Sequence, residues 1–313
     1  MSSKKKYKAW PPNDKKLPVY VIDNHTHLPL REEDLIEKNG VVLTCEQQIE
    51  MAYNVGIKQI ITSGCEYPDW DLTLKLAKNN KNVYAALAMH PNEAPAHHKI
   101  FEVAPDGLEP SKKQHHLDIS YSDAFDKVAS LCKDENVLAV GETGLDYFRT
   151  GSSGIEKQKE AFRDHIALAK ELDNPLQIHD RQAHADVVDI LLRDKAPERT
   201  VFHCFSGGRT LAEYCQENGW MASFAGPVTY KPNEDLRKAL ISMPRELILV
   251  ETDAPFLTPE PYRGCPNASY VMVETVEAIS KMWNENLYTT CLVLQANTQR
   301  IYELPILENE FEI

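Results

Sequence analysis

The chain has 313 residues, a length that can bury a large core and that suits one barrel-type domain as well as two smaller domains. It carries 47 acidic and 34 basic side chains, which give a formal net charge of -13. Because this charge repels a polyanion at long range, it argues against broad, sequence-independent wrapping of nucleic acid, and a phosphate substrate would need locally placed cations.

The seven cysteines include no C-x-x-C pair, and an odd number in a chain of this size does not indicate a disulfide framework. We therefore expect a reducing compartment, the cytoplasm or, as the alternative, the nucleus. Lysines 4–6 are not followed by an apolar segment of signal-peptide length, and no run approaches the roughly 20 apolar residues of a membrane-spanning helix. We expect no export, no membrane insertion and no obligate protein partner.

The first predicted strand, Val19–Ile22, is followed closely by His25 and His27. Residues two positions apart on an extended strand project from the same face, so these two imidazoles can bind one metal ion. A His-x-His pair can also be ordinary polar sequence at the end of a strand. The pair alone does not decide between the two interpretations.

The next predicted element is a helix over Cys45–Val55, in which apolar residues recur at intervals of three and four. Thr44 and Gln47 form a predicted capping box at its start, and Gly56 is a predicted C-cap at its end. A strand, a helix and a third strand are then predicted at Ile57–Thr62, Asp71–Lys78 and Val83–Met89.

The segment Pro91–Asp118 interrupts this alternation. It contains prolines, lysines and the pairs His97-His98 and His115-His116, and we interpret it as an insertion after the third strand. It could form a lid or substrate loop, or a solvated excursion without a role in binding. A helix near Tyr121–Lys133 then resumes the pattern.

The next three strands each end at a residue that can bind a metal. These pairs of strand and following residue are Val137–Val140 with Glu142, Pro175–Ile178 with His179, and Thr200–Phe202 with His203. The helices predicted in this part of the chain are Ile155–Glu171, Ala183–Leu192 and Leu211–Asn218.

The last predicted strand, Leu247–Val250, is followed by Asp253, which could be a turn residue or a further metal ligand. A strand and a helix precede it, at Met221–Phe224 and Asn233–Ser242. Two closing helices follow it, at Val271–Trp283 and Thr290–Tyr302.

Strands that alternate with helices predict a parallel sheet. Eight such units favour a closed (β/α)8 TIM barrel, whose strand C-termini open on one face and supply the catalytic groups. The alternative is an open doubly wound sheet, which favours a glycine-rich phosphate loop after the first strand, and Asp23-Asn24-His25 contains none. We expect an N-terminal extension over 1–17, one barrel domain over 18–304 and a peripheral tail over 305–313.

Six residues at the predicted strand ends are of the types that bind divalent ions, namely His25, His27, Glu142, His179, His203 and Asp253. Each alone could be a hydrogen-bonded core histidine, a helix cap or a turn residue. At the open end of one barrel, however, all six together would crowd buried polar groups without partners unless they bound ions.

Two divalent ions are the expected cofactor, and Mg²⁺, Mn²⁺ and Zn²⁺ all remain open. Glu142 is the predicted bridge, because a carboxylate has two oxygens. The expected ligand sets are His25, His27, Glu142 and Asp253 for one ion, and Glu142, His179 and His203 for the other. Ions roughly 3.5–4 Å apart can hold a hydroxide and stabilise an in-line displacement at phosphorus, with Asp253 accepting the proton of the attacking water as general base.

The arrangement resembles the TatD-type metal-dependent deoxyribonucleases of the amidohydrolase-like barrel superfamily. The motifs that carry this resemblance span nearly the whole chain: His25-x-His27, Met89-His90-Pro91, Gly141-Glu142-Thr143-Gly144-Leu145-Asp146, Ile178-His179-Asp180-Arg181, His203-Cys204-Phe205-Ser206-Gly207, Glu251-Thr252-Asp253-Ala254-Pro255 and Arg263-Gly264-x-x-Asn267. The resemblance implies a (β/α)8 barrel, a divalent-metal site of the six ligands and hydrolysis of DNA phosphodiesters, often as a 3′-to-5′ exonuclease on single strands or 3′ ends.

The resemblance also suggests that His90, Arg181 and Arg263 lie near the substrate, where the guanidinium groups could pair with phosphate oxygens. Arg181 could instead pair with a neighbouring carboxylate, and His90 could only shape a loop. We expect Cys204 to be a packing residue rather than a nucleophile or a ligand.

Two other functions use the same residues. A metal-dependent amidohydrolase or esterase can be built on the same barrel, and there a modified lysine commonly stands after the fourth strand, where this chain has Glu142. A binding or scaffold protein with a degenerate site is the second alternative, and the presence of all six expected ligands argues against it.

Overall fold

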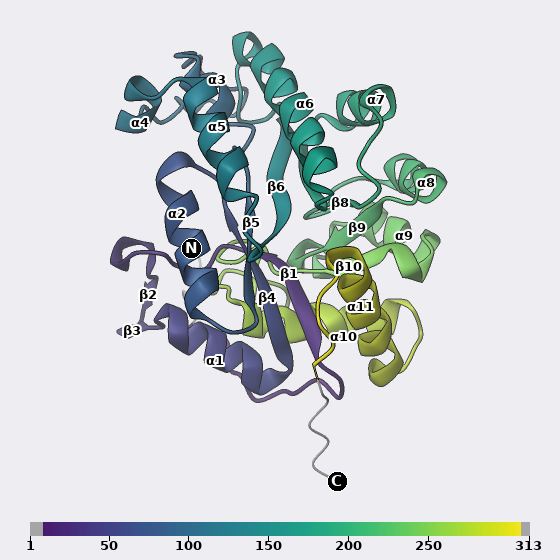
Figure 1. Cartoon of the computed structure of the whole chain (residues 1–313). Coiled ribbons are helices and arrows are strands. Elements are labelled where there is room, and N and C mark those ends of the chain that lie inside the picture. Colours follow the sequence, from purple (N-terminus) through teal and green to yellow (C-terminus); the bar gives the residue numbers. More distant parts are fainter. Residues whose placement is uncertain (1–8, 308–313) are drawn as a thin grey trace, which may run out of the picture.

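The computed structural model describes residues 9–307, so Lys4–Lys6 and the end of the predicted tail, 308–313, lie outside the described residues. Eight parallel strands form one sheet in the order β1-β4-β5-β6-β7-β8-β9-β10, with helices around the outside (Figure 1). The strands are β1 (Val21–Thr26), β4 (Ile57–Gly64), β5 (Val83–Leu87), β6 (Val137–Asp146), β7 (Leu176–Arg181), β8 (Thr200–Phe202), β9 (Met221–Phe224) and β10 (Ile248–Val250). The predicted (β/α)8 barrel is confirmed.

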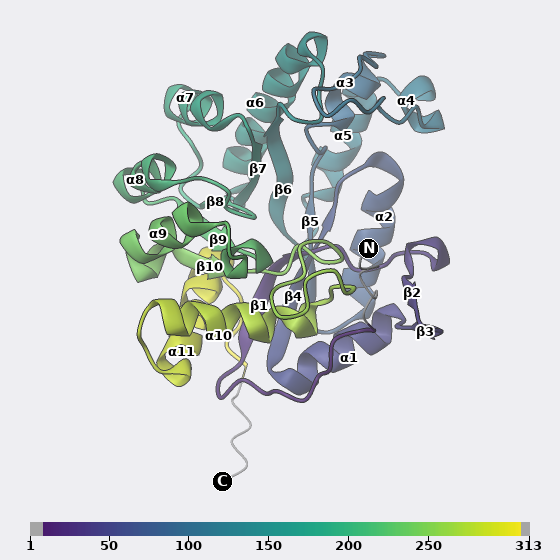
Figure 2. The same cartoon turned by 180° about the vertical axis from the view of Figure 1, so that it is seen from behind.

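The helices surround the strands on all sides, and Figure 2 shows the same arrangement from behind. They are α1 (Cys45–Val55), α2 (Tyr67–Asn79), α3 (Glu93–His97), α4 (Gln114–Asp118), α5 (Tyr121–Leu131), α6 (Ile155–Leu172), α7 (His184–Asp194), α8 (Arg209–Asn218), α9 (Glu234–Ser242), α10 (Met272–Met282) and α11 (Leu287–Tyr302). None of the helices in residues 9–307 has the length and apolar content needed to cross a membrane.

Helix α1 has the predicted boundaries because both of its ends are capped. The backbone N–H of Gln47 donates to Thr44 Oγ1 at 3.3 Å, and the backbone N–H of Thr44 donates to Gln47 Oε1 at 2.9 Å. At the other end Gly56 adopts a left-handed φ of 99°, a conformation that only a residue without a Cβ adopts freely.

The barrel closes between its first and last strands through a few specific hydrogen bonds. The Asn24 side-chain amide donates to the carbonyl of Val250 at 2.7 Å. Beyond the end of β10, the Asp253 N–H donates to the carbonyl of His25 at 3.0 Å, and the His27 N–H donates to the carbonyl of Ala254 at 2.7 Å. These bonds place the loop after β10 directly beside the end of β1.

The core has an inner and an outer part. The inner cluster takes one buried residue from each barrel strand except β7, namely Ile22, Ile61, Ala86, Ala139, Val201, Met221 and Leu249. Tyr302, at the end of α11, and Leu304, after it, also belong to this cluster. The outer and larger cluster lies between the sheet and the helices. Apolar residues thus fill the barrel, as is usual for this fold, and the polar residues gather where the strands end.

Several strand boundaries differ from the sequence-based prediction. β1 was expected to end at Ile22 but continues to Thr26, and β6 was expected to end at Val140 but continues to Asp146. In both cases neighbouring strands provide hydrogen-bond partners that override a polar or glycine-containing sequence. β5 ends at Leu87, earlier than the predicted Met89.

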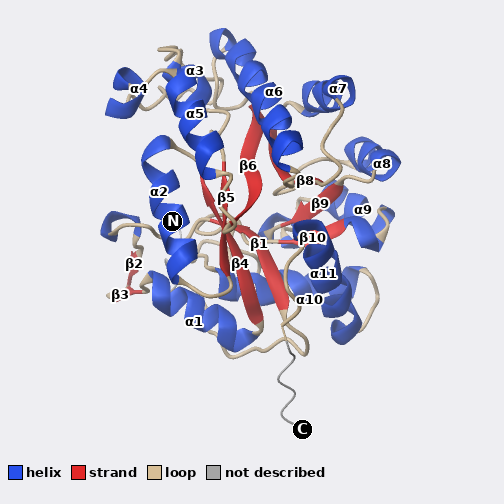
Figure 3. Cartoon of the chain, in the orientation of Figure 1, coloured by secondary structure: helices blue, strands red, loops and turns tan. Residues whose placement is uncertain are grey.

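Two regions that the sequence pattern left without structure form short elements (Figure 3). A two-stranded hairpin, β2 (Glu37–Lys38) with β3 (Val41–Val42), precedes α1. The insertion 91–118 contains α3 and α4. Elements of two to five residues are too short to produce a recognisable period, which is why the sequence did not reveal them.

Candidate metal centre

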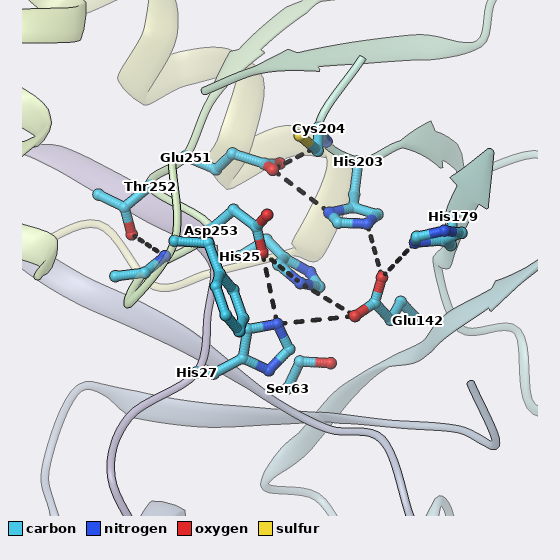
Figure 4. Close-up of polar contacts among 12 residues, drawn as sticks. His25, His27, Ser63, Glu142, His179, His203, Cys204, Glu251, Thr252 and Asp253 are labelled. Carbon is cyan, nitrogen blue, oxygen red and sulfur yellow. Dashed lines mark hydrogen bonds and ion pairs between the residues drawn. The ribbon is translucent and has the colours of Figure 1, made fainter. Parts of the chain in front are cut away.

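The six predicted ligands come together at one end of the barrel, although the first and the last of them, His25 and Asp253, are 228 positions apart along the chain. His25 and His27 come from the end of β1, Glu142 from β6, His179 from β7, His203 from the end of β8 and Asp253 from the loop after β10. Their side chains point toward one another (Figure 4). His25 is fully buried, and Glu142 is only 4% exposed.

Glu142 lies at the centre of this cluster, and its two oxygens face different histidines. Oε2 is 2.6 Å from Nε2 of His203 and 3.0 Å from Nδ1 of His179. Oε1 is 3.8 Å from Nε2 of His25 and 3.6 Å from Nε2 of His27. A carboxylate with each oxygen aimed at a separate pair of imidazoles has the arrangement that bridging two ions requires.

Asp253 completes the side of the cluster formed by β1. Its Oδ1 atom is 3.4 Å from Nε2 of His27 and 3.9 Å from Nε2 of His25. The residue has a positive φ of 50°, a conformation that is uncommon for residues other than glycine but is adopted by aspartate more often than by most. Its backbone hydrogen bond to His25 secures it in this position.

The hydrogen bonding of the His25 ring shows whether the cluster fits metal ions. Nδ1 of His25 lies 3.0 Å from Oε1 of Gln177, so the ring donates its proton there. Nε2 is buried and has no hydrogen-bond partner among residues 9–307. A buried lone pair aimed at two carboxylates is costly without a partner and is what a metal-binding imidazole presents, so the residues fit divalent ions.

A close approach of β6 to β7 brings Glu142 and His179 together. Gly144 has a φ of 140°, and a Cβ at this position would lie 2.1 Å from the carbonyl oxygen of His179. Only glycine fits there, so the glycines of the Gly-Glu-Thr-Gly motif allow the two strands to lie side by side near the site.

Three residues that orient the ligands were not assigned a role from the sequence. Gln177 accepts from His25, Asp146 Oδ2 lies 3.1 Å from Nε2 of His179, and Glu251 Oε1 lies 3.3 Å from Nδ1 of His203. Asp146 and Glu251 are parts of the motifs noted above. Gln177 could have been suspected because it is a polar residue within an otherwise apolar strand.

The pKa values in the cluster follow from burial and from the nearby charges. Burial alone would raise the pKa of Glu142, but His203 and His90 hold it well below its usual range. Burial lowers the pKa of His25 to about 3. Glu142 is therefore ionised and His25 is neutral near pH 7, which are the states in which these groups bind divalent ions.

His90 and Cys65 lie at the edge of the cluster. Nε2 of His90 is 3.9 Å from Oε2 of Glu142, and its ring centroid is 4.6 Å from that of His179. The Cys65 thiol donates to Oε1 of Glu142 at a distance of 3.3 Å. His90 is thus close enough to meet a molecule bound at the cluster, and Cys65 was missed because a lone cysteine after a strand has no distinctive pattern.

The two predicted substrate arginines lie farther out and have no direct contact with the cluster among the described residues. The Arg181 guanidinium lies 4.1 Å from the ring centroid of Phe148, and that of Arg263 lies 4.2 Å from the ring centroid of Tyr230. Both arginines are exposed, and neither forms an ion pair within residues 9–307. Arg181 is therefore not taken up by a neighbouring carboxylate.

The thiol of Cys204 is protonated at neutral pH. Burial and the neighbouring carboxylates of Asp253 and Glu251 raise the pKa of its thiol well above the usual range. A protonated thiol is a poor nucleophile and a poor metal ligand. The packing role that we expected for Cys204 stays a prediction.

A cavity of about 330 Å³ opens beside His27 and Cys65. Its wall includes Trp10 and Phe256, and the ring of Phe256 lies 6.2 Å from that of His27, centroid to centroid. Phe256 is 60% exposed, although it is a large apolar residue. The cavity gives a molecule access to the cluster past an aromatic side chain.

Comparison with known proteins shows similarity along nearly the whole chain. The family model described as TatD related DNase matches residues 22–303. The chain is 34% identical over 291 residues to the uncharacterized metal-dependent hydrolase TatD of Mycobacterium tuberculosis, with 91% of this chain and 98% of that protein covered. It is 30% identical to the uncharacterized metal-dependent hydrolase YabD of Bacillus subtilis, with 91% and 99% covered.

A solved structure agrees with these sequence matches. The crystal structure of YjjV, a TatD homologue from Escherichia coli K12, superposes with a TM-score of 0.71 at 25% sequence identity. The superposition covers 91% of this chain and 98% of that one. The agreement therefore extends over the whole barrel.

Proposed function

The chain belongs to the TatD-related DNase family and is a metal-dependent hydrolase, and from this premise we propose that it hydrolyses phosphodiester bonds of DNA, working from the 3′ end. The observation that carries the proposal is the position of Glu142 between two pairs of histidines. This arrangement suits two ions, and a two-ion site suits displacement at phosphorus.

The residues that would hold the two ions divide around Glu142. His25 and His27 lie beside Oε1 of Glu142, and Asp253 lies beside these two histidines. His179 and His203 lie beside Oε2. When bound, divalent ions lower the pKa of water and offset the negative charge of the phosphate. Mg²⁺, Mn²⁺ and Zn²⁺ are all compatible with this set of imidazoles and carboxylates.

Asp253 is the proposed general base. Burial would raise its pKa, but the hydrogen bond from His27 and the charge of His203 outweigh this and lower it. The carboxylate is therefore ionised at neutral pH and can accept a proton from the attacking water at Oδ1 or Oδ2. Asp253 lies 3.4 Å from His27, and His27 lines the cavity through which water and substrate would enter.

The substrate would make a shallow contact, because the net charge of -13 opposes extended binding of DNA. Arg181, Arg263 and His90 are the proposed phosphate contacts. The two guanidiniums lie over aromatic rings and form no ion pairs within residues 9–307, so they can still pair with phosphate oxygens. Phe256 is a suitable surface on which a terminal base can stack.

Activity of metal-stripped protein on single-stranded DNA tests the proposal. The DNA carries a label at its 5′ end, and Mg²⁺, Mn²⁺ or Zn²⁺ is restored separately. We expect no cleavage without metal, and with metal a ladder of products that shorten progressively from the 3′ end.

Absence of product with every ion would contradict the proposal. A parallel panel of lactone, ester and amide substrates would then reveal hydrolysis of carbon esters or amides by the same centre. If DNA labelled at its 3′ end gives a ladder that shortens from the 5′ end, the protein hydrolyses DNA but works in the opposite direction to the one proposed.

A further inference from the structure

A second group of histidines lies in the insertion, outside the cluster at the barrel end. Glu93 and His97 belong to α3, and His115 and His116 belong to α4, which lies next to α3 (Figure 1). One nitrogen of each histidine and one carboxylate oxygen of Glu93 lie within 4.8 Å of one another. Neither histidine pair of the insertion, His97-His98 or His115-His116, has a role in the proposed hydrolysis.

His97 is the buried member of this group and has an unused nitrogen. His97 is only 3% exposed. Nδ1 lies 3.0 Å from the carbonyl oxygen of Ile119, so the ring donates its proton there. Nε2 is buried and has no hydrogen-bond partner within residues 9–307. A backbone carbonyl that fixes one ring nitrogen and leaves the other as a free lone pair is the usual setting of a metal-binding histidine.

Glu93 connects the other members. Its Oε2 atom lies 3.2 Å from Nε2 of His115 and 2.7 Å from Nε2 of His116. Nδ1 of His116 accepts the backbone N–H of Lys113 at 3.2 Å, so its proton is on Nε2 and is donated to Glu93. His116 therefore orients the carboxylate, and its lone pair is not available to an ion.

We propose that Glu93, His97 and His115 form a second metal site that binds Zn²⁺ and links α3 to α4. Two imidazole nitrogens and a carboxylate oxygen are a ligand set that zinc prefers, and such a set leaves one coordination position for water. A cavity of about 260 Å³, lined by Glu93, His116 and Arg149 among others, lies beside the group and gives water and ions access.

The proposed site explains how two very short helices keep their positions. α3 and α4 have five residues each, and helices of that length have little stability of their own. A network of hydrogen bonds that joins Glu93 to His115 and His116 is the metal-free alternative. That network would account for two of the histidines, but it leaves the buried Nε2 of His97 without a partner, which is unfavourable.

Zinc content of the full-length protein tests the site. Each protein is loaded with excess Zn²⁺ and dialysed, and its metal is counted per chain by plasma mass spectrometry. We expect His97→Gln to hold one zinc fewer than the wild type. His98→Gln is the matched control, because His98 is the next residue but stacks on Tyr121 at 4.9 Å and is not part of the group. We expect this control to hold as much zinc as the wild type.

Equal zinc content in the wild type and in a folded His97→Gln protein would overturn the proposal, and so would an equal loss in both variants. Circular dichroism shows whether each variant is folded. If His97→Gln does not fold, His115→Gln replaces it, because that side chain is less buried at 12% exposed.

Amide hydrogen exchange of the wild type provides a measurement that needs no variant. We expect the backbone amides of 114–118 to exchange more slowly with zinc than in chelator, since none of these residues belongs to the cluster at the barrel end. Unchanged exchange at 114–118 would also overturn the proposal.

Discussion

Glu251 lies behind His203, with its Oε1 atom 3.3 Å from Nδ1 of that imidazole. The same oxygen accepts the backbone N–H of Cys204 at 2.8 Å. On the far side of the ring, Nε2 of His203 faces Glu142 at 2.6 Å. A buried carboxylate thus sets the orientation of an imidazole whose other nitrogen points into the proposed metal centre, a relationship common among metal-binding histidines.

Replacing Glu251 with Gln should weaken metal binding without unfolding the protein. Gln has the same shape and can still accept one hydrogen bond, but it lacks the charge that orients and polarises His203. We expect the affinity for Mn²⁺ to fall about 10- to 100-fold in calorimetric titration. Glu246→Gln, at an exposed position, is the control and should bind like the wild type. Wild-type affinity in Glu251→Gln would show that the carboxylate does not support the ligand.

Replacing Asp253 with Asn should remove turnover while leaving metal bound. The amide oxygen can still act as a ligand, but an amide cannot accept the proton of the attacking water. We expect kcat on single-stranded DNA to fall about 10²- to 10⁴-fold, with at least one ion per chain retained in metal analysis. The exposed Asp189→Asn is the matched control. Near-full activity of Asp253→Asn would exclude Asp253 from proton transfer.

The barrel and the positions of the six ligand-type residues could be predicted from the sequence. Each strand corresponds to an apolar run, and each ligand-type residue follows such a run. His203 comes immediately after the short buried strand β8, and His179 lies within β7, directly after its buried residues Leu176, Gln177 and Ile178. In a parallel barrel all strand ends lie on one face, so residues distant in sequence become neighbours. No detailed packing was needed to reach that conclusion.

The hydrogen bonds that orient the ligands could not be predicted in the same way. Gln177 contacts His25 across 152 positions of the chain, and nothing in the local pattern distinguishes it from any polar residue in a strand. The grouping of Glu93 with His116 depends on how the insertion folds back, and a segment without periodicity does not show this. Such contacts depend on register and loop path, which a single sequence leaves undetermined.

Phe256 should affect substrate binding more than the chemical step. Its ring is 60% exposed beside the cavity and does not belong to the cluster. If a terminal base stacks on it, Phe256→Ala should raise KM for single-stranded DNA about tenfold with little change in kcat, in line with about 1–3 kcal/mol per stacked base. Tyr214→Ala removes an exposed aromatic ring from α8 and should leave KM unchanged. Equal effects of the two changes would remove Phe256 from substrate binding.

Gly144→Ala should destabilise the barrel near the metal centre. An added Cβ would lie 2.1 Å from the carbonyl oxygen of His179, and the φ of 140° is unfavourable for alanine. We expect the free energy of unfolding in urea to fall by about 3 kcal/mol or more. Gly208→Ala is the matched control, since nothing lies within 4 Å of a Cβ there. A loss of less than about 1 kcal/mol in Gly144→Ala would mean that β6 and β7 separate easily.

His165 should make the stability of the fold depend on pH. The ring is fully buried, its Nδ1 donates to the carbonyl of Ala161 at 2.7 Å, and its Nε2 accepts the N–H of Met89 at 3.1 Å. Burial lowers its pKa to about 4. Above about pH 6.5 the ring is neutral in both the folded and the unfolded chain, so the titration of His165 does not change the free energy of unfolding there.

As the pH falls from 6.5 toward 4, the unfolded chain binds a proton at His165 that the folded chain excludes, so stability is lost in this window. Between pH 7 and pH 5 this residue should account for about 2 kcal/mol of the loss. His165→Gln, whose amide oxygen can still accept the Met89 N–H, should reduce the loss by that amount. Urea unfolding of metal-stripped protein at the two pH values measures the difference, because stripping removes the pH dependence of metal binding. The same loss in wild type and variant would mean that another group titrates in this range.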